Sequence, residues 1–191
     1  MPNATSGCRA SALACIVASV AGLLAACASG TPAPRNNSPP VAAVWQPHQA
    51  TLDYFGLTSL YTCDGLENNV RTLLLYLGAR PDLKVQAIGC DRPLNAPGHI
   101  ATVRADFYTL APAVGDTAGA VAARWDPVAI RPLVPVWMGM GLCELLQQIK
   151  PVVTKDFSAR DLNYHTACVP YDTTISDYNI SSEVLKPVAL R

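Results

Sequence analysis

Four cysteines fall into two pairs of nearly equal spacing, Cys63 with Cys90 and Cys143 with Cys168. The members lie 27 positions apart in the first pair and 25 positions apart in the second. Each pair encloses a helical segment, a short turn and a strand, so the pattern predicts a twofold structural repeat with low residue identity between its halves. Four cysteines allow three pairings, and the repeat favours one disulfide within each pair.

A cysteine nucleophile is the enzymatic alternative, with Cys143 or Cys168 close to His165. A reactive cysteine needs a thiolate and a positioned base. His165 and Cys168 are three residues apart in a predicted strand, so their side chains point to opposite faces. The sequence also contains no serine nucleophile elbow, phosphate loop or zinc-protease helix. We therefore expect structural disulfides and no catalytic residue.

A copper site could be drawn from Met138, Met140, Cys143 and His165, because thioether and thiolate ligands favour Cu(I). No CxxC or His-x-His pattern accompanies these residues. The two methionines also lie among Trp and Gly, where core filling explains them. We therefore expect no metal and no other cofactor.

Asp64 and Asp91 each follow a cysteine, and they could approach each other as a pair of catalytic carboxylates. Asp64 also fits the N-cap of a helix, with Glu67 three residues on as in a capping box. Asp91 fits a turn, since Arg and Pro follow it. These local roles explain both aspartates without catalysis.

The first helix is predicted over residues 66–77, because apolar residues recur there at helical intervals. The apolar stripe consists of Leu66, Val70, Leu73, Leu74 and Leu77. Gly78 fits the left-handed position that follows a helix, and Pro81 prevents continuation. A strand is predicted over residues 83–88, where apolar and polar residues alternate at first.

The second cysteine segment repeats this pattern, with a helix over residues 142–153 and a strand over residues 161–166. Pro151 predicts a kink or an early end of that helix. Two further strands are predicted: residues 51–62 are rich in aromatic and β-branched residues, and residues 100–110 alternate clearly. A glycine within the first of these strands indicates a bulge.

Residues 125–133 are predicted to form an edge strand, because Pro127 and Pro132 cannot donate to a ladder. The resulting order of strands and helices is that of a ferredoxin-like split βαβ fold. We therefore predict the α+β class, a two-layer sandwich with two disulfides. The two strands of a βαβ unit run parallel, so the helix start and the end of the second strand lie at one sheet edge. The two cysteines of each pair would meet there.

The N-terminal segment has the composition of an export signal. Its apolar stretch ends in Leu24-Ala25-Ala26-Cys27, and Arg9 is the only charged residue among the first 34. This resembles the lipobox of bacterial lipoproteins, in which the cysteine is acylated and becomes the first mature residue. The resemblance implies a signal peptide over residues 1–26 and lipidation of Cys27. Ordinary cleavage after Ala28 is the alternative, and it would release a soluble periplasmic protein.

Composition divides the remaining chain into a tether, one domain and a tail. Residues 27–42 are rich in Pro, Ser, Asn and Ala and cannot bury enough apolar surface to fold. Residues 43–187, about 145 in number, suit a single α/β domain with its own core, and residues 188–191 form a short tail. Near the tether, Trp45 and His48 either bind a partner or pack over the sheet edge.

Three short runs are similar to those of an uncharacterised family of exported, lipoprotein-like proteobacterial proteins. They are Cys63-Asp64-Gly65-Leu66, Leu77-Gly78-Ala79-Arg80 and Leu142-Cys143-Glu144-Leu145. The resemblance spans about residues 54–170 and brings no activity, ligand or catalytic residue. In lipoproteins of this type an Asp after the acylated cysteine signals inner-membrane retention. Ala28 occupies that position, so the resemblance implies the outer membrane.

The charge balance excludes one class of partner. The chain has 14 Lys and Arg against 14 Asp and Glu, and it has no basic run, so nucleic acid binding lacks electrostatic support. We expect a lipoprotein at the periplasmic face of the outer membrane, held there by its lipid anchor. Its role would be binding or assembly with an unknown envelope protein. An envelope enzyme and a periplasmic copper carrier are the alternatives.

The anchoring hypothesis predicts the behaviour of Cys27→Ser. This substitution removes the only thiol that the lipobox offers for acylation, so metabolic labelling with a fatty acid should be lost. The domain should then leave the membrane fraction. Labelling and membrane retention equal to those of the native chain would contradict the hypothesis.

Overall fold

The computed structural model describes residues 38–90, 98–115, 118–135 and 142–188. Their elements are, in chain order, β1 (Val41–Phe55), α1 (Cys63–Tyr76), β2 (Lys84–Ile88), β3 (Ile100–Pro112), β4 (Val121–Ile130), α2 (Cys143–Asp156), β5 (Ala159–Val169) and β6 (Asp172–Pro187). The order is therefore βαββ followed by a second βαββ. No helix in these described ranges is long and apolar enough to cross a membrane.

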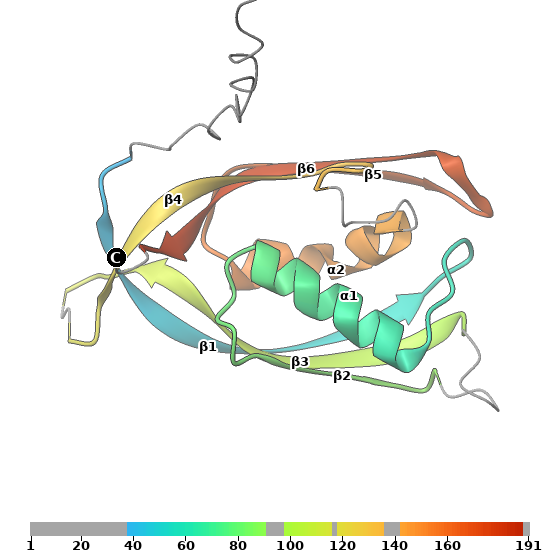
Figure 1. Cartoon of the computed structure of the whole chain (residues 1–191), viewed down its shortest axis with the longest axis horizontal. Helices are drawn as coiled ribbons and strands as arrows, with labels where there is room; N and C mark the ends of the chain where they lie inside the picture. Colours follow the sequence, from blue (N-terminus) through green and yellow to red (C-terminus); the bar gives the residue numbers. More distant parts are fainter. Residues whose placement is uncertain (1–37, 91–97, 116–117, 136–141, 189–191) are drawn as a thin grey trace, which may run out of the picture. The chain divides into compact units, whose positions relative to one another are not determined.

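One antiparallel sheet contains all six described strands in the order β2-β3-β1-β4-β6-β5. The order of the first half, β2-β3-β1, is mirrored by β4-β6-β5 in the second. The halves meet where residues 41–43 of β1 pair with residues 121–123 of β4. Beyond this junction β1 pairs only with β3, and β4 only with β6. Figure 1 shows two three-stranded leaves diverging from it, with both helices between them.

In each half the strands on either side of the helix run parallel with a third strand between them, and this connection explains the disulfides. β1 and β2 are both antiparallel to β3, so they are parallel to each other, as β4 and β5 are around β6. The start of each helix therefore lies near the end of the following strand. Cys63 pairs with Cys90 at a Cα–Cα distance of 5.4 Å, and Cys143 pairs with Cys168 at 5.6 Å. Both predicted pairings are confirmed.

The predicted mixed class with two disulfides is confirmed, but the number and order of strands differ from the ferredoxin-like prediction. The sequence analysis does not predict β6, and it treats residues 125–133 as an edge strand. β4 instead lies between β1 and β6. Its Pro127 lies beyond Ala123, the last residue paired with β1. β4 has a single strand neighbour at Pro127, which is the situation that a proline tolerates.

The N-terminal boundary of the domain also differs from the prediction. β1 begins at Val41, inside the predicted tether, and it pairs with β3 from Ala43 to Phe55. The predicted strand over residues 51–62 is therefore the second half of β1 followed by a loop. Gly56 lies in this loop rather than in a bulge, and a Cβ atom there would meet the Tyr54 hydroxyl.

The helix ends show which local signals hold. Thr62 is the N-cap of α1, because its side chain accepts a hydrogen bond from the Gly65 amide at 3.1 Å. The predicted cap, Asp64, lies inside the first turn, and Glu67 bonds to β2 instead of closing a capping box. Gly78 has the predicted left-handed conformation, with φ +101°. α2 continues through Pro151 to Asp156, so the predicted early end is wrong.

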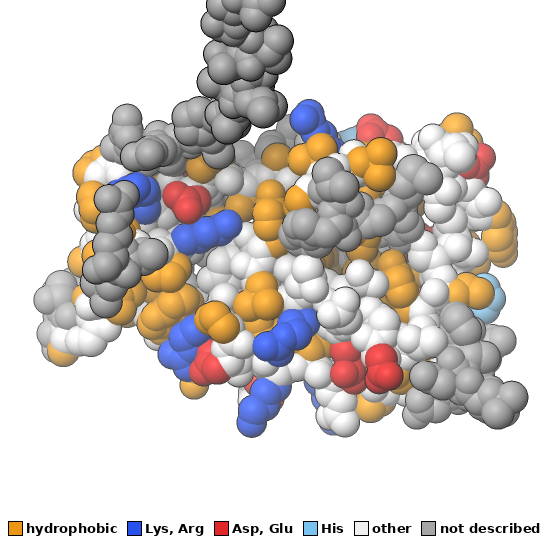
Figure 2. Space-filling model, viewed as in Figure 1, with side chains coloured by type: hydrophobic (Ala, Val, Ile, Leu, Met, Phe, Trp, Pro, Cys, Tyr) orange, Lys and Arg blue, Asp and Glu red, His pale blue; other side chains and the backbone are white. Residues whose placement is uncertain are grey.

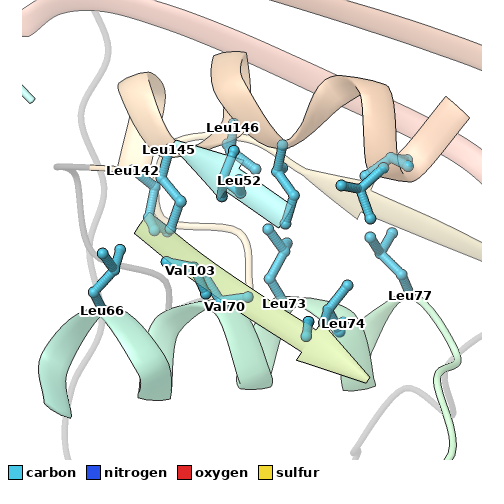
Figure 3. Close-up of a cluster of buried hydrophobic side chains, with 14 of the residues drawn as sticks. Leu52, Leu66, Val70, Leu73, Leu74, Leu77, Val103, Leu142, Leu145 and Leu146 are labelled. Carbon is cyan, nitrogen blue, oxygen red and sulfur yellow. The ribbon is translucent and has the colours of Figure 1, made fainter. Parts of the chain in front are cut away.

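The main core lies between the two helices and the leaves. Figure 3 shows the leucines of α1 and α2 pointing toward one another, with Leu52 of β1 and Val103 of β3 beside them. The predicted stripe of α1 is buried throughout. Burial of a large aliphatic side chain contributes about 1.5–3 kcal/mol, so this layer supplies the main apolar driving force for folding.

A sequence repeat with a period of 80 residues underlies the two halves. The motif Val-Ala-Ala-x-Trp-x-Pro occupies residues 41–47 and again residues 121–127. The same shift relates Cys63 to Cys143 and Arg80 to Arg160. Each arginine lies over an aromatic ring: Arg80 over Tyr108 at 3.7 Å and Arg160 over Trp125 at 3.9 Å. The halves are therefore more alike in sequence than the cysteine spacing alone indicates.

The inner edges of β1 and β4 each receive a side chain from the opposite half at one residue. Gln148 of α2 accepts from the Phe55 amide at 2.8 Å and donates to the Phe55 carbonyl at 2.6 Å. Tyr76 of α1 donates to the Ala129 carbonyl of β4 at 3.0 Å and accepts from its amide at 3.4 Å. Each helix thus supplies hydrogen-bond partners to a strand of the other half, at a point where that strand has no neighbouring strand on its inner side.

Tyr76→Phe tests this cross-half contact. The substitution keeps the ring and removes the hydroxyl, which leaves both polar groups of Ala129 without this partner. We expect the free energy of unfolding to fall by about 1–2 kcal/mol, measured by urea denaturation. Tyr171→Phe, at an exposed tyrosine, is the matched control and should change stability by less than about 0.5 kcal/mol. Equal effects of the two substitutions would contradict the proposed role.

Candidate functional site

We call one end of the domain the tip. It comprises residues 55–62, 89–90, 98–100 and 169–172, which are the end of β1, the loop before α1, the flanks of β2 and β3, and the β5–β6 turn. The tip lies on the right in Figure 1, where β1 ends. It combines segments of both halves, so a site here depends on how the halves are held together.

The carboxylate of Glu144 organises the loop between β1 and α1. It accepts hydrogen bonds from three consecutive backbone amides: Leu57 at 3.0 Å, Thr58 at 3.0 and 3.1 Å, and Ser59 at 3.2 Å. Glu144 is only 7% exposed, and hydrogen bonds to a buried charged group are stronger than neutral ones. This residue of α2 therefore fixes a loop of the other half.

Thr58 connects the same loop to the β5–β6 turn. Its hydroxyl donates to the Val169 carbonyl at 3.3 Å and accepts from the Tyr171 amide at 2.9 Å. The loop thus receives contacts from α2 through Glu144 and from the β5–β6 turn through Thr58. The tip is consequently an ordered junction of both halves.

The buried Tyr54, the half-buried Tyr61 and one histidine complete the support of the loop. Burial raises the pKa of Tyr54, and burial raises that of Tyr61 to about 12. The Tyr54 hydroxyl stays protonated and donates to the Ser59 carbonyl at 2.5 Å. His99 Nδ1 lies 2.7 Å from the Gly56 carbonyl, so Nδ1 carries the hydrogen.

A pocket of about 400 Å³ opens at the tip. Its lining consists of Phe55, Leu57, Gly89, Cys90, Gly98, His99, Ile100 and Tyr171. Large apolar residues of the rim remain accessible: Phe55 is 50% exposed, Ile100 63% and Tyr171 77%. Figure 2 shows hydrophobic side chains at the surface of this end of the molecule. None of these lining residues is an Asp, Glu, Lys or Arg, so the pocket suits an apolar group.

The structure separates the candidate catalytic residues of the sequence. Cys143 and Cys168 are joined to each other, and Cys143 is buried. His165 lies on the exposed side of β5, with Nε2 3.7 Å from Asp177 Oδ2. Cys90, joined to Cys63, lines the tip pocket as part of its wall. The thiols thus serve as crosslinks, and the histidine has a carboxylate rather than a thiol as its neighbour.

Several predicted positions fall outside the described residues. These are the lipidation residue Cys27, the carboxylate Asp91, and the proposed copper ligands Met138 and Met140. Among the residues that the structure does describe, no group of three or more His, Cys, Asp and Glu side chains could hold a metal ion.

His48, whose role the sequence analysis left open, is half-buried in a polar cluster. The Thr109 hydroxyl donates to the Asp156 carbonyl at 2.7 Å, so it accepts from His48 Nε2 at 2.9 Å. His48 Nδ1 lies 3.5 Å from Asp156 Oδ1, and its ring stacks on Phe107. The cluster ties the end of α2 to β1 and β3.

The residues that build the tip are mostly ones that sequence analysis did not select. Glu144 appears there only within a family-like run, and Gln148, Thr58 and Tyr171 do not appear at all. One signal was available in the sequence. Glu144 follows the cysteine at the start of an amphipathic helix, and it lies on the apolar side of that helix, which becomes buried. Its partners are backbone amides 85–87 positions away, which leave no side-chain pattern.

Glu144→Gln tests the support of the tip loop. The amide presents one oxygen and a donor group to three backbone donors, so at least one amide loses its acceptor. We expect the free energy of unfolding to fall by about 2–3 kcal/mol, measured by chemical denaturation. Hydrogen exchange of residues 57–59 should also become faster. Gln147→Ala, on the exposed side of the same helix, is the control and should have neither effect.

Comparison with known proteins does not identify a relative of this chain. No family model, curated protein or solved structure matches the chain. The function therefore has to be inferred from the chain itself.

Proposed function

We propose that the chain is a lipoprotein at the periplasmic face of the outer membrane, whose domain binds an envelope protein through the tip. The lipobox-like run ending in Cys27 supports the anchor, and Ala28 supports the outer membrane. Two disulfides support a non-reducing compartment, because cytosolic thiols are kept reduced. Each half keeps the split βαβ connection of ferredoxin-like folds as the scaffold of this module.

The direction of β1 supports the choice of the tip as the binding end. The tether joins β1 at Val41, and the strand reaches the tip at Phe55. Its 15 residues span about 46 Å at the usual rise of a strand. The far end of β1 is therefore the part of this strand with the greatest reach from the anchor.

The observation that carries the proposal is the exposed apolar rim of the tip pocket. Phe55, Ile100 and Tyr171 are exposed around a loop that Glu144 holds from the other half and that Thr58 connects to the β5–β6 turn. Exposed apolar patches around a concave site mark interaction surfaces. An apolar side chain of an envelope protein fits a pocket with this lining, and aromatic rim residues are enriched at such contacts.

Photo-crosslinking in intact cells tests the tip. A photoreactive amino acid at Ile100 should yield a covalent adduct with a second protein, and one at Gln86, exposed on β2, should not. Tyr171→Ala should reduce the adduct at least several-fold while the domain stays folded. No adduct at Ile100, or an equal yield at Gln86, would contradict binding through the tip. Repeating the experiment in Cys27→Ser separates failure of the anchor from failure of the tip.

A further inference from the structure

The two outer edges of the sheet, β2 and β5, are treated differently by the helices that pack beside them. β2 and β5 are the first and last strands in the sheet order. The backbone amides and carbonyls on such an edge can pair with a strand of another chain. Because the two halves repeat, the side chains that cover the β2 edge can be compared with those at the equivalent positions beside β5.

The edge of β2 is closed by α1. Glu67 Oε1 accepts from the Ala87 amide at 2.8 Å. Arg71, one turn later, donates to the carbonyl of Leu83, just before β2, at 2.7 Å. These two side chains occupy backbone groups along the edge, so a further strand could not pair with β2 without displacing them.

The edge of β5 lacks both of these side chains. The positions 80 residues after Glu67 and Arg71 are Gln147 and Pro151. Among the described residues, no side chain hydrogen-bonds to the backbone of residues 162–168. Register shifts interrupt β5 before Asn163 and after Ala167. A regular edge of five residues between these two positions is therefore open to pairing.

The charge on the helix-facing side of this edge indicates what binds there, while Asp177 lies beside His165 on the opposite face. Lys150 lies on the exposed side of α2, with its ammonium group 5.5 Å from the ring of Tyr164 in β5. A strand added to β5 would place alternate side chains over this exposed side. Acidic side chains would pair with Lys150. A second copy of the chain, paired about His165, would bring the two copies of Lys150 into one layer, where like charges repel.

We propose that the outer edge of β5 binds an extended acidic segment of a partner protein by strand addition. The juxtaposition of an unblocked edge with Lys150 carries this proposal, which does not depend on the tip or the lipid anchor. Backbone hydrogen bonds to Asn163–Ala167 supply the affinity, and acidic side chains at alternate positions supply the selectivity.

The probe is a short synthetic peptide in which glutamate alternates with valine and threonine, added to the full-length chain in detergent. Bound peptide should slow hydrogen exchange in Asn163–Ala167 by about tenfold or more, which corresponds to about 1.4 kcal/mol. Residues 84–88 of β2 provide the internal control and should not change. The same peptide with N-methylated backbone amides should not bind, because it lacks the donors for strand pairing.

Two variants test the edge and the charge separately. Gln147→Glu with Pro151→Arg gives α2 the two residue types that close the edge of β2 in α1, without a change in net charge. This double substitution should abolish protection. Lys150→Glu should weaken binding at least tenfold, and Lys84→Glu, the same charge change on β2, should not. Circular dichroism and thermal melting establish that each variant is folded.

Three results would overturn the proposal. The first is absence of protection in β5 with the acidic peptide. The second is unchanged peptide binding in the Gln147→Glu, Pro151→Arg variant. The third is a concentration-dependent dimer that protects Asn163–Ala167 without peptide, because this would assign the edge to a second copy of the chain.

Discussion

The structure depends on the hydrogen bonds that each helix makes to the strand of the other half. β1 and β4 share only the pairing of residues 41–43 with 121–123, so both strands would otherwise expose their inner edges to the core. An intramolecular hydrogen bond contributes about 0.5–1.5 kcal/mol to stability. Gln148 and Tyr76 supply the missing partners at Phe55 and Ala129. The leaves can diverge enough to hold two helices because these contacts replace strand pairing.

The disulfides and the polar contacts act on different parts of the fold. Within one half, Cys63 joins the start of α1 to Cys90 just after β2, and Cys143 joins the start of α2 to Cys168 near the end of β5. Glu144 and Thr58 act between the halves, and both converge on the loop that follows β1. The tip therefore has a rigid support although it is made of loops and turns. A rigid support is what lets Phe55 and Ile100 remain exposed in a fixed arrangement instead of collapsing into the core.

The repeat makes the differences between the halves informative. Residues near the junction keep the same motif in both halves, because both strands make the same pairing there. The helix positions that cover the sheet edge differ, with Glu67 and Arg71 in α1 but Gln147 and Pro151 in α2. The tip is also asymmetric, since β2 and β3 are joined by a longer segment than β5 and β6. The two halves thus share their backbone topology but differ in the side chains at their surfaces.

The sequence by itself determined the helices, several strands and the pairing of the cysteines. The helical periodicity from Leu66 to Leu77 and the nearly equal cysteine spacings can be read from the sequence without knowing how the elements pack. The period of 80 residues was also present in the sequence, but its clearest copy begins in residues assigned to the tether. Only the tertiary structure decided the sheet order and the roles of Glu144 and Gln148, because their partners are backbone groups 85–93 positions away. Backbone groups are the same in every residue, so no sequence pattern marks which of them a side chain will meet.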